Sequence, residues 1–157
     1  MDKVTYPSGA SIVISTEDHV ESIYPFIRQQ DKIEIGHQGY LPKEALDMAL
    51  EFDDETYTVL DKDDVPFAMF GVGDIHADEG YIWMLSTDTI YDYKNDFLRH
   101  SKFWIKNMTN KYSKYTNWVH KENSLSVRWL LWCGATFVEQ TQINDAPFIK
   151  FQFYNIK

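Results

Sequence analysis

The middle of the chain carries two strand-like segments separated by one long amphipathic helix. Tyr81–Ser86 and Tyr115–His120 are typical of strands, and the stretch from about Asp92 to Lys111 repeats apolar residues at helical spacing. A strand–helix–strand crossover sets its two strands parallel within one sheet, whereas the flanking segments form hairpins, which are antiparallel. The predicted class is α+β, with a mixed, mostly antiparallel sheet of about six to seven strands flanked by helices.

The remaining segments add helices and hairpin strands around that crossover. A β-branched run at Ala10–Ser15 is typical of a strand, and the oxygens of Ser15–Asp18 can cap a helix that Pro25 then interrupts. A second helix opens at Pro42 and is expected to bury one apolar stripe, Leu41, Ala45, Met48, Ala49 and Phe52. The expected order is strand, two helices, three strands, helix, strand, helix and two strands. The other elements are predicted as strands over 56–60, 65–72, 136–142 and 147–154, and as a helix between Asn123 and Gly134.

Composition limits the partners of such a domain. With 157 residues and 44% hydrophobic content, the chain can bury one core, so residues 1–157 are expected to form a single domain. A formal net charge of -9 opposes binding to nucleic acid or to an anionic membrane surface, and it favours a cationic acceptor such as an amine. The polar N-terminus and the absence of a run of roughly 18 apolar residues predict a cytoplasmic protein without a membrane span.

The cysteine and histidine content argues against a metal or disulfide framework. Cys133 is the single cysteine, and its place between Trp132 and Gly134 predicts a small buried apolar residue. None of the five histidines stands at metal-ligand spacing from another His or Cys, so no metal is expected.

The best candidates for chemistry lie between the first two expected helices. Arg28, Asp31 and Glu34 recur at three-residue spacing, so they share one face if the segment is helical. Glu34 or Asp31 can then serve as a base or bind an amine, with Arg28 holding the carboxylates at the substrate site. The alternative is an ion pair on a solvated helix end. His37 is the histidine best placed for acid–base work, and its alternative is a surface or loop position.

Local motifs give the chain a family resemblance. Asn123, Ser126 and Gly134 stand at offsets common in the GNAT superfamily of acyl-CoA-dependent acetyltransferases, and the element order is similar along nearly the whole chain. A narrower set of runs resembles tailed-phage proteins described as GNAT-like, some of which are called internal virion or internal core proteins. These runs are 28–34, 67–72, 81–88, 97–99 and 123–134.

The resemblance implies a site as well as a fold. In GNAT proteins the two parallel strands splay apart, the acyl-CoA arm fills the gap, and a helix N-terminus receives the pyrophosphate. Acetyl-CoA is thus the implied cofactor, and an amine, small-molecule or protein, the implied acceptor. Carried onto this sequence, the implied cofactor contacts are Trp83, Met84, Leu85, Ser86, Thr87, Lys94, Asn95 and Asn123.

Two departures from that pattern leave the function open. The turn after Ser86 has no glycine and contains Asp88 and Asp92, and Leu130 stands where many GNAT enzymes have a tyrosine acid. Tyr81 or Tyr154 are the substitutes that the sequence offers. One hypothesis is a phage-encoded N-acyltransferase acting in an infected cell. Another is a catalytically inactive phage protein that acts in virion assembly or host take-over through protein contacts, and a third is acyl-CoA bound as a structural or regulatory ligand only.

Overall fold

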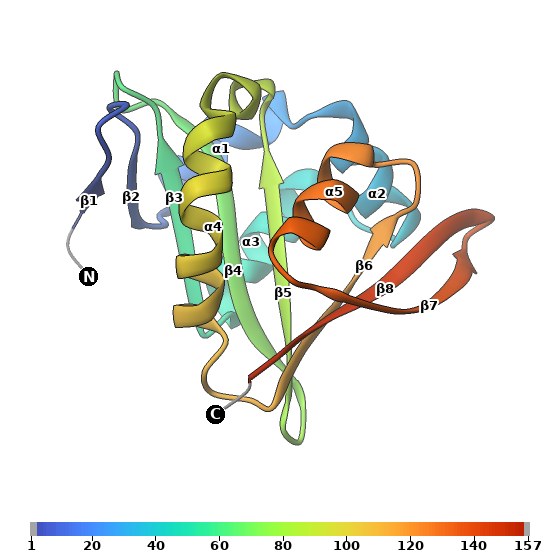
Figure 1. Ribbon diagram of the computed structural model, residues 1–157. Helices are drawn as coiled ribbons and strands as arrows, with labels where there is room; N and C mark the ends of the chain where they lie inside the picture. The colour runs from blue at the N-terminus through green and yellow to red at the C-terminus, as the bar shows by residue number, and fades with distance from the viewer. Residues whose placement is uncertain (1–2, 156–157) are drawn as a thin grey trace.

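The computed structural model describes residues 3–155, which form one eight-stranded sheet with helices on both faces (Figure 1). Along the sheet the strands follow the order β1-β2-β3-β4-β5-β6-β8-β7. In chain order the elements are β1 (Val4–Thr5), β2 (Ser11–Ile14), α1 (Glu17–Ile23), the 3-10 helix η1 (Tyr24–Phe26), α2 (Gln29–His37), α3 (Pro42–Phe52), β3 (Glu55–Leu60), β4 (Pro66–His76), β5 (Glu79–Ser86), the 3-10 helix η2 (Asp88–Tyr93), α4 (Lys94–Met108), β6 (Lys114–His120), α5 (Ser124–Trp132), β7 (Thr136–Ile143) and β8 (Ala146–Tyr154).

The predicted mixed sheet is confirmed. Every neighbouring pair is antiparallel except β5 and β6, which run parallel and are joined by the crossover through α4. The sheet has more strands than expected because the short β1 adds an edge strand beside β2. No helix in the described range has the length and apolar character needed to cross a bilayer.

Strand alternation sends neighbouring side chains into two separate cores. On one face, Met69 and Leu85 pack with Val20 and Ile23 of α1 and Leu46 of α3. On the other face, the adjacent strand residues pack under α4 and α5; this larger core includes Phe70, Val72, Ile82, Trp104, Ile105, Met108 and Leu130. In Figure 1, α4 and α5 lie in front of the sheet and α3 behind it.

The helix starts follow the expected local chemistry, with one addition. The Thr16 side chain accepts from the N–H of His19 and the His19 ring accepts from the N–H of Thr16, which forms a capping box for α1. Pro25 then turns the chain into η1. The separate helix α2 was missing from the predicted order, because its apolar residues form no continuous stripe. The long helix expected over 92–111 begins later, at Lys94, after η2.

Two expectations about helix surfaces were wrong. Leu46 and Ala49 form the buried face of α3, whereas Leu41, Met48 and Phe52 are 71%, 40% and 66% exposed. The predicted stripe was right at Ala49 and wrong at the exposed positions, of which Met48 and Phe52 line a cavity rather than the core. The second error concerns the start of α5, where the Asn123 side chain makes no capping bond.

Candidate functional site

A gap opens between the two parallel strands in the middle of the sheet. β5 and β6 pair only at Glu79 with Lys114, Gly80 with Tyr115 and Tyr81 with Thr116. Beyond that point the strands diverge (Figure 1), although β5 stays paired with β4 and β6 with β8 up to their ends. The Asn117 side chain bridges the closed end, because its Nδ2 donates to the Ile82 carbonyl at 2.8 Å. The expected splayed pair is therefore present.

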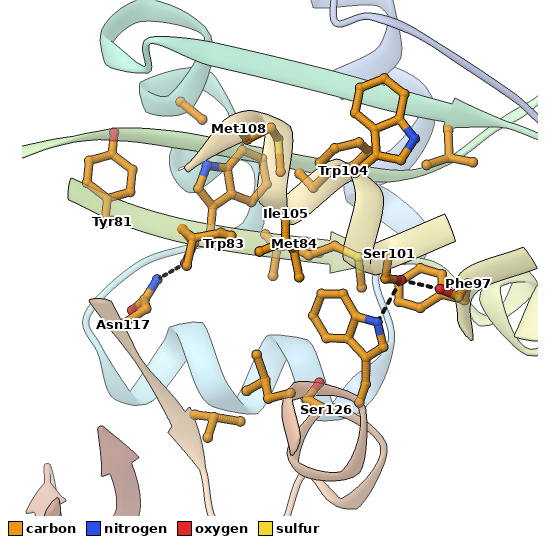
Figure 2. Close-up of a pocket in the computed structure, with 18 of the residues that line it drawn as sticks. Tyr81, Trp83, Met84, Phe97, Ser101, Trp104, Ile105, Met108, Asn117 and Ser126 are labelled. Atoms are coloured by element: carbon orange, nitrogen blue, oxygen red, sulfur yellow. Dashed lines mark hydrogen bonds between the residues drawn. The ribbon is translucent and has the colours of Figure 1, made fainter. Parts of the chain in front are cut away.

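A cavity of about 470 Å³ occupies this gap. Its lining comes from both faces of the sheet, so the cavity runs through the layer rather than beside it (Figure 2). On the α4 and α5 side it is lined by Met84, Phe97, Ser101, Trp104, Ser126 and Trp129. On the α2 and α3 side it is lined by Glu34, Tyr40, Met48, Phe52, Asp53, Tyr81, Trp83 and Trp118.

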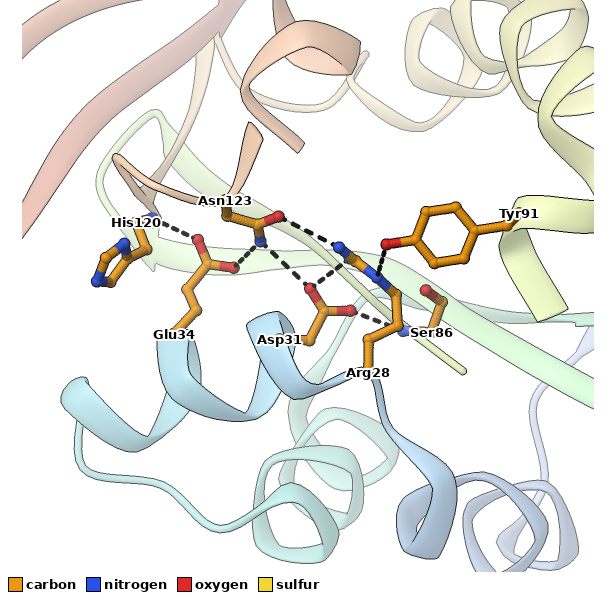
Figure 3. A network of polar contacts seen from close by, with 7 residues as sticks. All are labelled: Arg28, Asp31, Glu34, Ser86, Tyr91, His120 and Asn123. Atoms are coloured by element: carbon orange, nitrogen blue, oxygen red, sulfur yellow. Dashed lines mark hydrogen bonds and ion pairs between the residues drawn. The ribbon is translucent and has the colours of Figure 1, made fainter. Parts of the chain in front are cut away.

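The wide end of the gap is spanned by a buried polar network that begins at α2 (Figure 3). The Arg28 guanidinium and the Asp31 carboxylate form an ion pair at 3.0 Å, with side chains only 4% and 3% exposed. Asp31 Oδ2 accepts from the N–H of Ser86 at 3.1 Å, and the Arg28 N–H donates to the Ser86 carbonyl at 2.8 Å. The solvated helix-end alternative is thus wrong: this pair fixes the last residue of β5.

Glu34 does the same for the last residue of β6. Its Oε1 accepts from the N–H of His120 at 2.6 Å, and its Oε2 accepts from Asn123 Nδ2 at 3.3 Å. Asn123 also bonds to Asp31 and to Arg28, each at 3.4 Å, which explains why its side chain does not cap α5. The spacing of Arg28, Asp31 and Glu34 therefore did predict one shared face, and α2 uses it to hold the two diverging strands.

The network contains one cation, the Arg28 guanidinium, and two carboxyl groups, those of Asp31 and Glu34. Burial raises the pKa of Glu34 to about 8; the His120 N–H opposes that rise, and the neighbouring Asp31 carboxylate adds to it. Burial likewise raises the pKa of Asp31, against the attraction of Arg28. Since a single guanidinium balances a single negative charge, one proton shared by the two carboxyl groups makes the cluster neutral.

The structure brings only some of the sequence-predicted site residues to the cavity. Trp83, Met84, Leu85 and Glu34 line it. Thr87 lies in the turn, where its side chain accepts from the N–H of Thr89, and Lys94 and Asn95 are exposed at the start of α4. The other candidates lie outside the lining: Arg28, Asp31, His37, Ser86 and Asn123.

Three positions that the sequence singled out, His37, Tyr154 and Leu130, have well-defined surroundings. The His37 ring lies against His120, with ring centres 5.8 Å apart, and at the edge of Phe148. Tyr154 pairs with Lys114 and donates to Gln152 at 2.5 Å, away from the cavity. Leu130 is buried in the core, as its side chain requires. Of the two proposed substitutes for a tyrosine acid, only Tyr81 lines the cavity.

Sequence reasoning missed a second carboxylate site, at the closed end of the gap. Asp53 accepts hydrogen bonds from the Tyr81 hydroxyl, from Trp83 Nε1 at 2.6 Å and from the Thr56 hydroxyl at 3.2 Å. Burial raises the pKa of Asp53 to about 6, although these bonds lower it. Tyr81 and Trp83 lie one and three residues past Gly80, but Asp53 is far from both in sequence, so no local motif joins them.

Two strand glycines make room for this cluster. Gly71 is paired with Trp83 and Gly73 with Tyr81. A Cβ on Gly71 would lie 2.6 Å from the Asp53 carboxylate, and a Cβ on Gly73 would overlap the Tyr81 hydroxyl. Glycine weakens a strand interior, so its presence at both positions indicates a close approach that a larger residue would block. Gly71 and Gly73 were the sequence signal that could have indicated the Asp53 cluster.

Comparison with known proteins depends on the fold alone. The sequence matches no family model and no curated protein. The structure is similar to a ribosomal-protein-S5-alanine acetyltransferase from Vibrio fischeri (TM-score 0.67, 14% identity, 99% of this chain and 97% of that chain). It is also similar to a GNAT-family acetyltransferase from Bacillus anthracis (TM-score 0.67, 10% identity, 98% and 99%). A third similar structure is an aminoglycoside acetyltransferase in complex with coenzyme A (TM-score 0.66, 12% identity, 92% and 94%).

The fold is the GNAT fold. Each match covers nearly the whole of both chains, so the fold assignment extends over nearly the whole of this chain. At these low sequence identities, structural similarity establishes the architecture only. The chemistry has to be argued from the cavity and its side chains.

Proposed function

We propose that the protein is an acyl-CoA-dependent N-acyltransferase that acts on an amine, with acetyl-CoA as its donor. The observation that carries the proposal is the divergence of β5 and β6 after Tyr81 around a cavity of about 470 Å³. A thin thioester arm can lie along the free edge of β5 in the way a further strand would. The solved aminoglycoside acetyltransferase of the same fold contains coenzyme A, which supports this choice of ligand.

The residues beside the gap fit such an arm. Beyond the Ile82 carbonyl, which accepts from Asn117, the edge of β5 from Trp83 to Leu85 faces no strand partner, so the backbone groups on this edge can bond the amides of the arm. Met84, Phe97 and Trp129 offer apolar surface beside it. The bound thioester would supply an electrophilic acyl carbon, and the protein would supply a water-poor cavity with carboxyl groups that can take the amine proton.

The turn after β5 offers the pyrophosphate less than a glycine-rich turn does. The N–H groups of Thr87, Thr89 and Ile90 already donate to Phe67 and Thr87. Asp88 and Asp92 add negative charge nearby. We therefore assign the phosphate contacts to exposed side chains at the start of α4, Lys94 and Asn95, and the main recognition to the arm.

Glu34 is the sequence-predicted base, and Asp53 is a second carboxyl group that lines the cavity and can take the amine proton. Glu34 lines the cavity as well, and burial raises its pKa to about 8, so the fraction of Glu34 that is ionised near neutral pH is a stronger base than an ordinary carboxylate. Asp31 and Arg28 support it by fixing Asn123, and His37 lies beside His120, whose N–H bonds to Glu34.

Thermal unfolding with and without acetyl-CoA tests the proposal. A ligand that binds only the folded chain stabilises it by RT ln(1 + [L]/Kd), so millimolar acetyl-CoA should raise the unfolding temperature. Release of free thiol in the presence of an amine should follow. An unchanged unfolding temperature at millimolar donor would contradict the proposal.

A catalytically inactive role is the second candidate. It is favoured by the internally bonded turn after β5 and by Leu130 at the usual tyrosine position. In that case the chain would be a GNAT-fold phage protein that works through contacts with virion or host proteins, in line with the resemblance of its sequence runs. Donor binding without thiol release would favour the third hypothesis, a bound but unreactive acyl-CoA.

A further inference from the structure

The carboxylate of Asp53, like that of Glu34, has only neutral hydrogen-bond partners, and unlike Glu34 it has no guanidinium in its cluster. Asp31 bonds to the Arg28 guanidinium, and the exposed Asp54 bonds to the Lys111 ammonium. The hydrogen bonds described for Asp53 come from two hydroxyls and one indole N–H. A carboxylate in a mainly apolar cavity without a cation beside it attracts one, because burial removes the water that would otherwise balance its charge.

Asp53 stands where the two reactants of the proposed function would meet. Its partner Tyr81 is the last β5 residue that pairs with β6, so the cluster marks the closed end of the gap. An arm whose nucleotide end lies at Lys94 and Asn95, as proposed above, would direct its tip toward this end of β5. The glycines Gly71 and Gly73 let Tyr81 and Trp83 lie flat against the sheet and direct their polar atoms to Asp53.

The surroundings of Asp53 are apolar and partly open to solvent. Tyr40, Met48 and Phe52 line the same cavity on the α2 and α3 side, and they are 42%, 40% and 66% exposed. Trp118 lines it from β6. Large apolar side chains at the mouth of a cavity are typical of a binding surface. This mouth therefore fits an apolar body attached to a cationic group.

We propose that Asp53, Tyr81 and Trp83 form the acceptor site, which takes a primary ammonium carried on an aromatic or aliphatic body. This inference rests on the proposed function in one respect: that function makes the bound amine the acyl acceptor. An Asp53 oxygen receives the ammonium and takes one of its protons, which leaves a neutral amine with a free electron pair. The apolar body lies against Met48, Phe52 and Trp118.

Binding of phenethylamine in the absence of any acyl donor tests the site directly. Isothermal titration calorimetry on the full chain would compare three probes: phenethylamine, 2-phenylethanol, which keeps the ring without the charge, and ethanolamine, which keeps the charge without the ring. Phenethylamine should bind the most tightly. Equal affinity for phenethylamine and 2-phenylethanol, or no heat from millimolar phenethylamine, would overturn the proposal.

Asp53→Asn and Asp54→Asn are a matched pair of variants. Both remove one negative charge from adjacent positions, but only Asp53 lines the cavity. D53N should weaken phenethylamine binding about tenfold or more, as expected for loss of a charge-assisted hydrogen bond, and D54N should leave it within about twofold. Equal affinities in the two variants would sink the assignment. Should D53N lose its cooperative melt, Tyr81→Phe serves in its place, with weaker amine binding expected and unchanged binding counting against the site.

The outcomes separate this inference from the proposed function. Amine binding that depends on Asp53 while acetyl-CoA gives no thermal shift would remove the acyltransferase and keep the cation site. Thiol release that D53N leaves intact and Glu34→Gln abolishes would keep the acyltransferase and transfer the proton-accepting role to Glu34.

Discussion

Arg28 is a buried residue whose loss should lower stability strongly. It is the guanidinium bonded to Asp31 inside the network, with both side chains almost fully buried. Arg28→Met should lower the free energy of unfolding by about 3–5 kcal/mol, because it leaves a buried carboxylate without its cation. Urea unfolding followed by tryptophan fluorescence measures this, with the exposed Arg99→Met expected to change stability by less than about 0.5 kcal/mol.

A double variant separates lost packing from the unpaired charge. In R28M/D31N the Asp31 carboxylate is replaced by a neutral amide. Part of the stability lost in R28M should therefore return despite the extra substitution. If the double variant is as unstable as the sum of the two single variants, the charge pair does not explain the effect of R28M.

Gly73 offers a test of close packing at the second carboxylate site. Gly73→Ala should destabilise the protein by about 1–3 kcal/mol, because the added methyl overlaps the Tyr81 side chain. In a Tyr81→Ala background the same change should cost much less, since the overlap is removed. Denaturant titration of the four variants measures the coupling, and additive effects would contradict it.

At the scale of residues, the sequence located one carboxylate site and missed the other. Arg28, Asp31 and Glu34 stand three apart, so helical geometry alone put them on one face. Their burial was not predictable, because it depends on the ends of β5 and β6, which reach α2 only through the folded sheet. Asp53 was missed for the same reason, since its partners Tyr81 and Trp83 lie 28 and 30 residues away.

At the scale of elements, the crossover was the reliable signal. Two strand-like runs around a long amphipathic helix required a parallel pair, and that pair is present as β5 and β6. The errors lie where apolar patterns are ambiguous. Met48 and Phe52 of α3 were assigned to the core because they are apolar, but a cavity lining is apolar as well. Periodicity finds the apolar face and does not say what covers it.

The turn between β5 and α4 leads to a prediction about the donor. Because Thr87, Thr89 and Ile90 direct their N–H groups to acceptors within the chain, little backbone remains for a pyrophosphate. Acetyl-pantetheine, which lacks the nucleotide, should therefore bind within about tenfold of acetyl-CoA, a free-energy difference of about 1.4 kcal/mol. Calorimetric titration compares them. A difference of a thousandfold would restore the phosphate contacts to a leading role.

At the scale of the whole molecule, several buried acids should make stability depend on pH. The pKa of Glu34 is raised to about 8, that of Asp53 to about 6, and that of Asp31 is raised as well. At these three groups the folded chain holds more protons than the unfolded chain above about pH 4.5, so their contribution to stability falls as the pH rises toward 8, and the lowered pKa of His19 opposes it in part. Self-repulsion from a net charge of -9 acts in the same direction as the three acids.

Glu34→Gln should flatten this dependence. The variant lacks a carboxyl group whose pKa is raised to about 8, so its free energy of unfolding should vary less than that of the parent chain between pH 5 and 8, by an amount on the order of a few kcal/mol. Urea titrations at a series of pH values measure the slope. Parallel profiles for the two proteins would show that Glu34 titrates normally in the folded state.

The brevity of the β5–β6 pairing also has a mechanical consequence. β1 to β5 form one continuous half of the sheet and β6, β8 and β7 the other, and the backbone seam between them is three residue pairs long. Beyond that seam the halves are joined by the Asn117 side chain, which bonds to Ile82, and by α2, which bonds to Ser86 of β5 and to His120 of β6. A rotation about the seam would leave the hydrogen-bond ladder inside either half intact but would strain the bonds of α2, so the buried network sets how far the passage can widen.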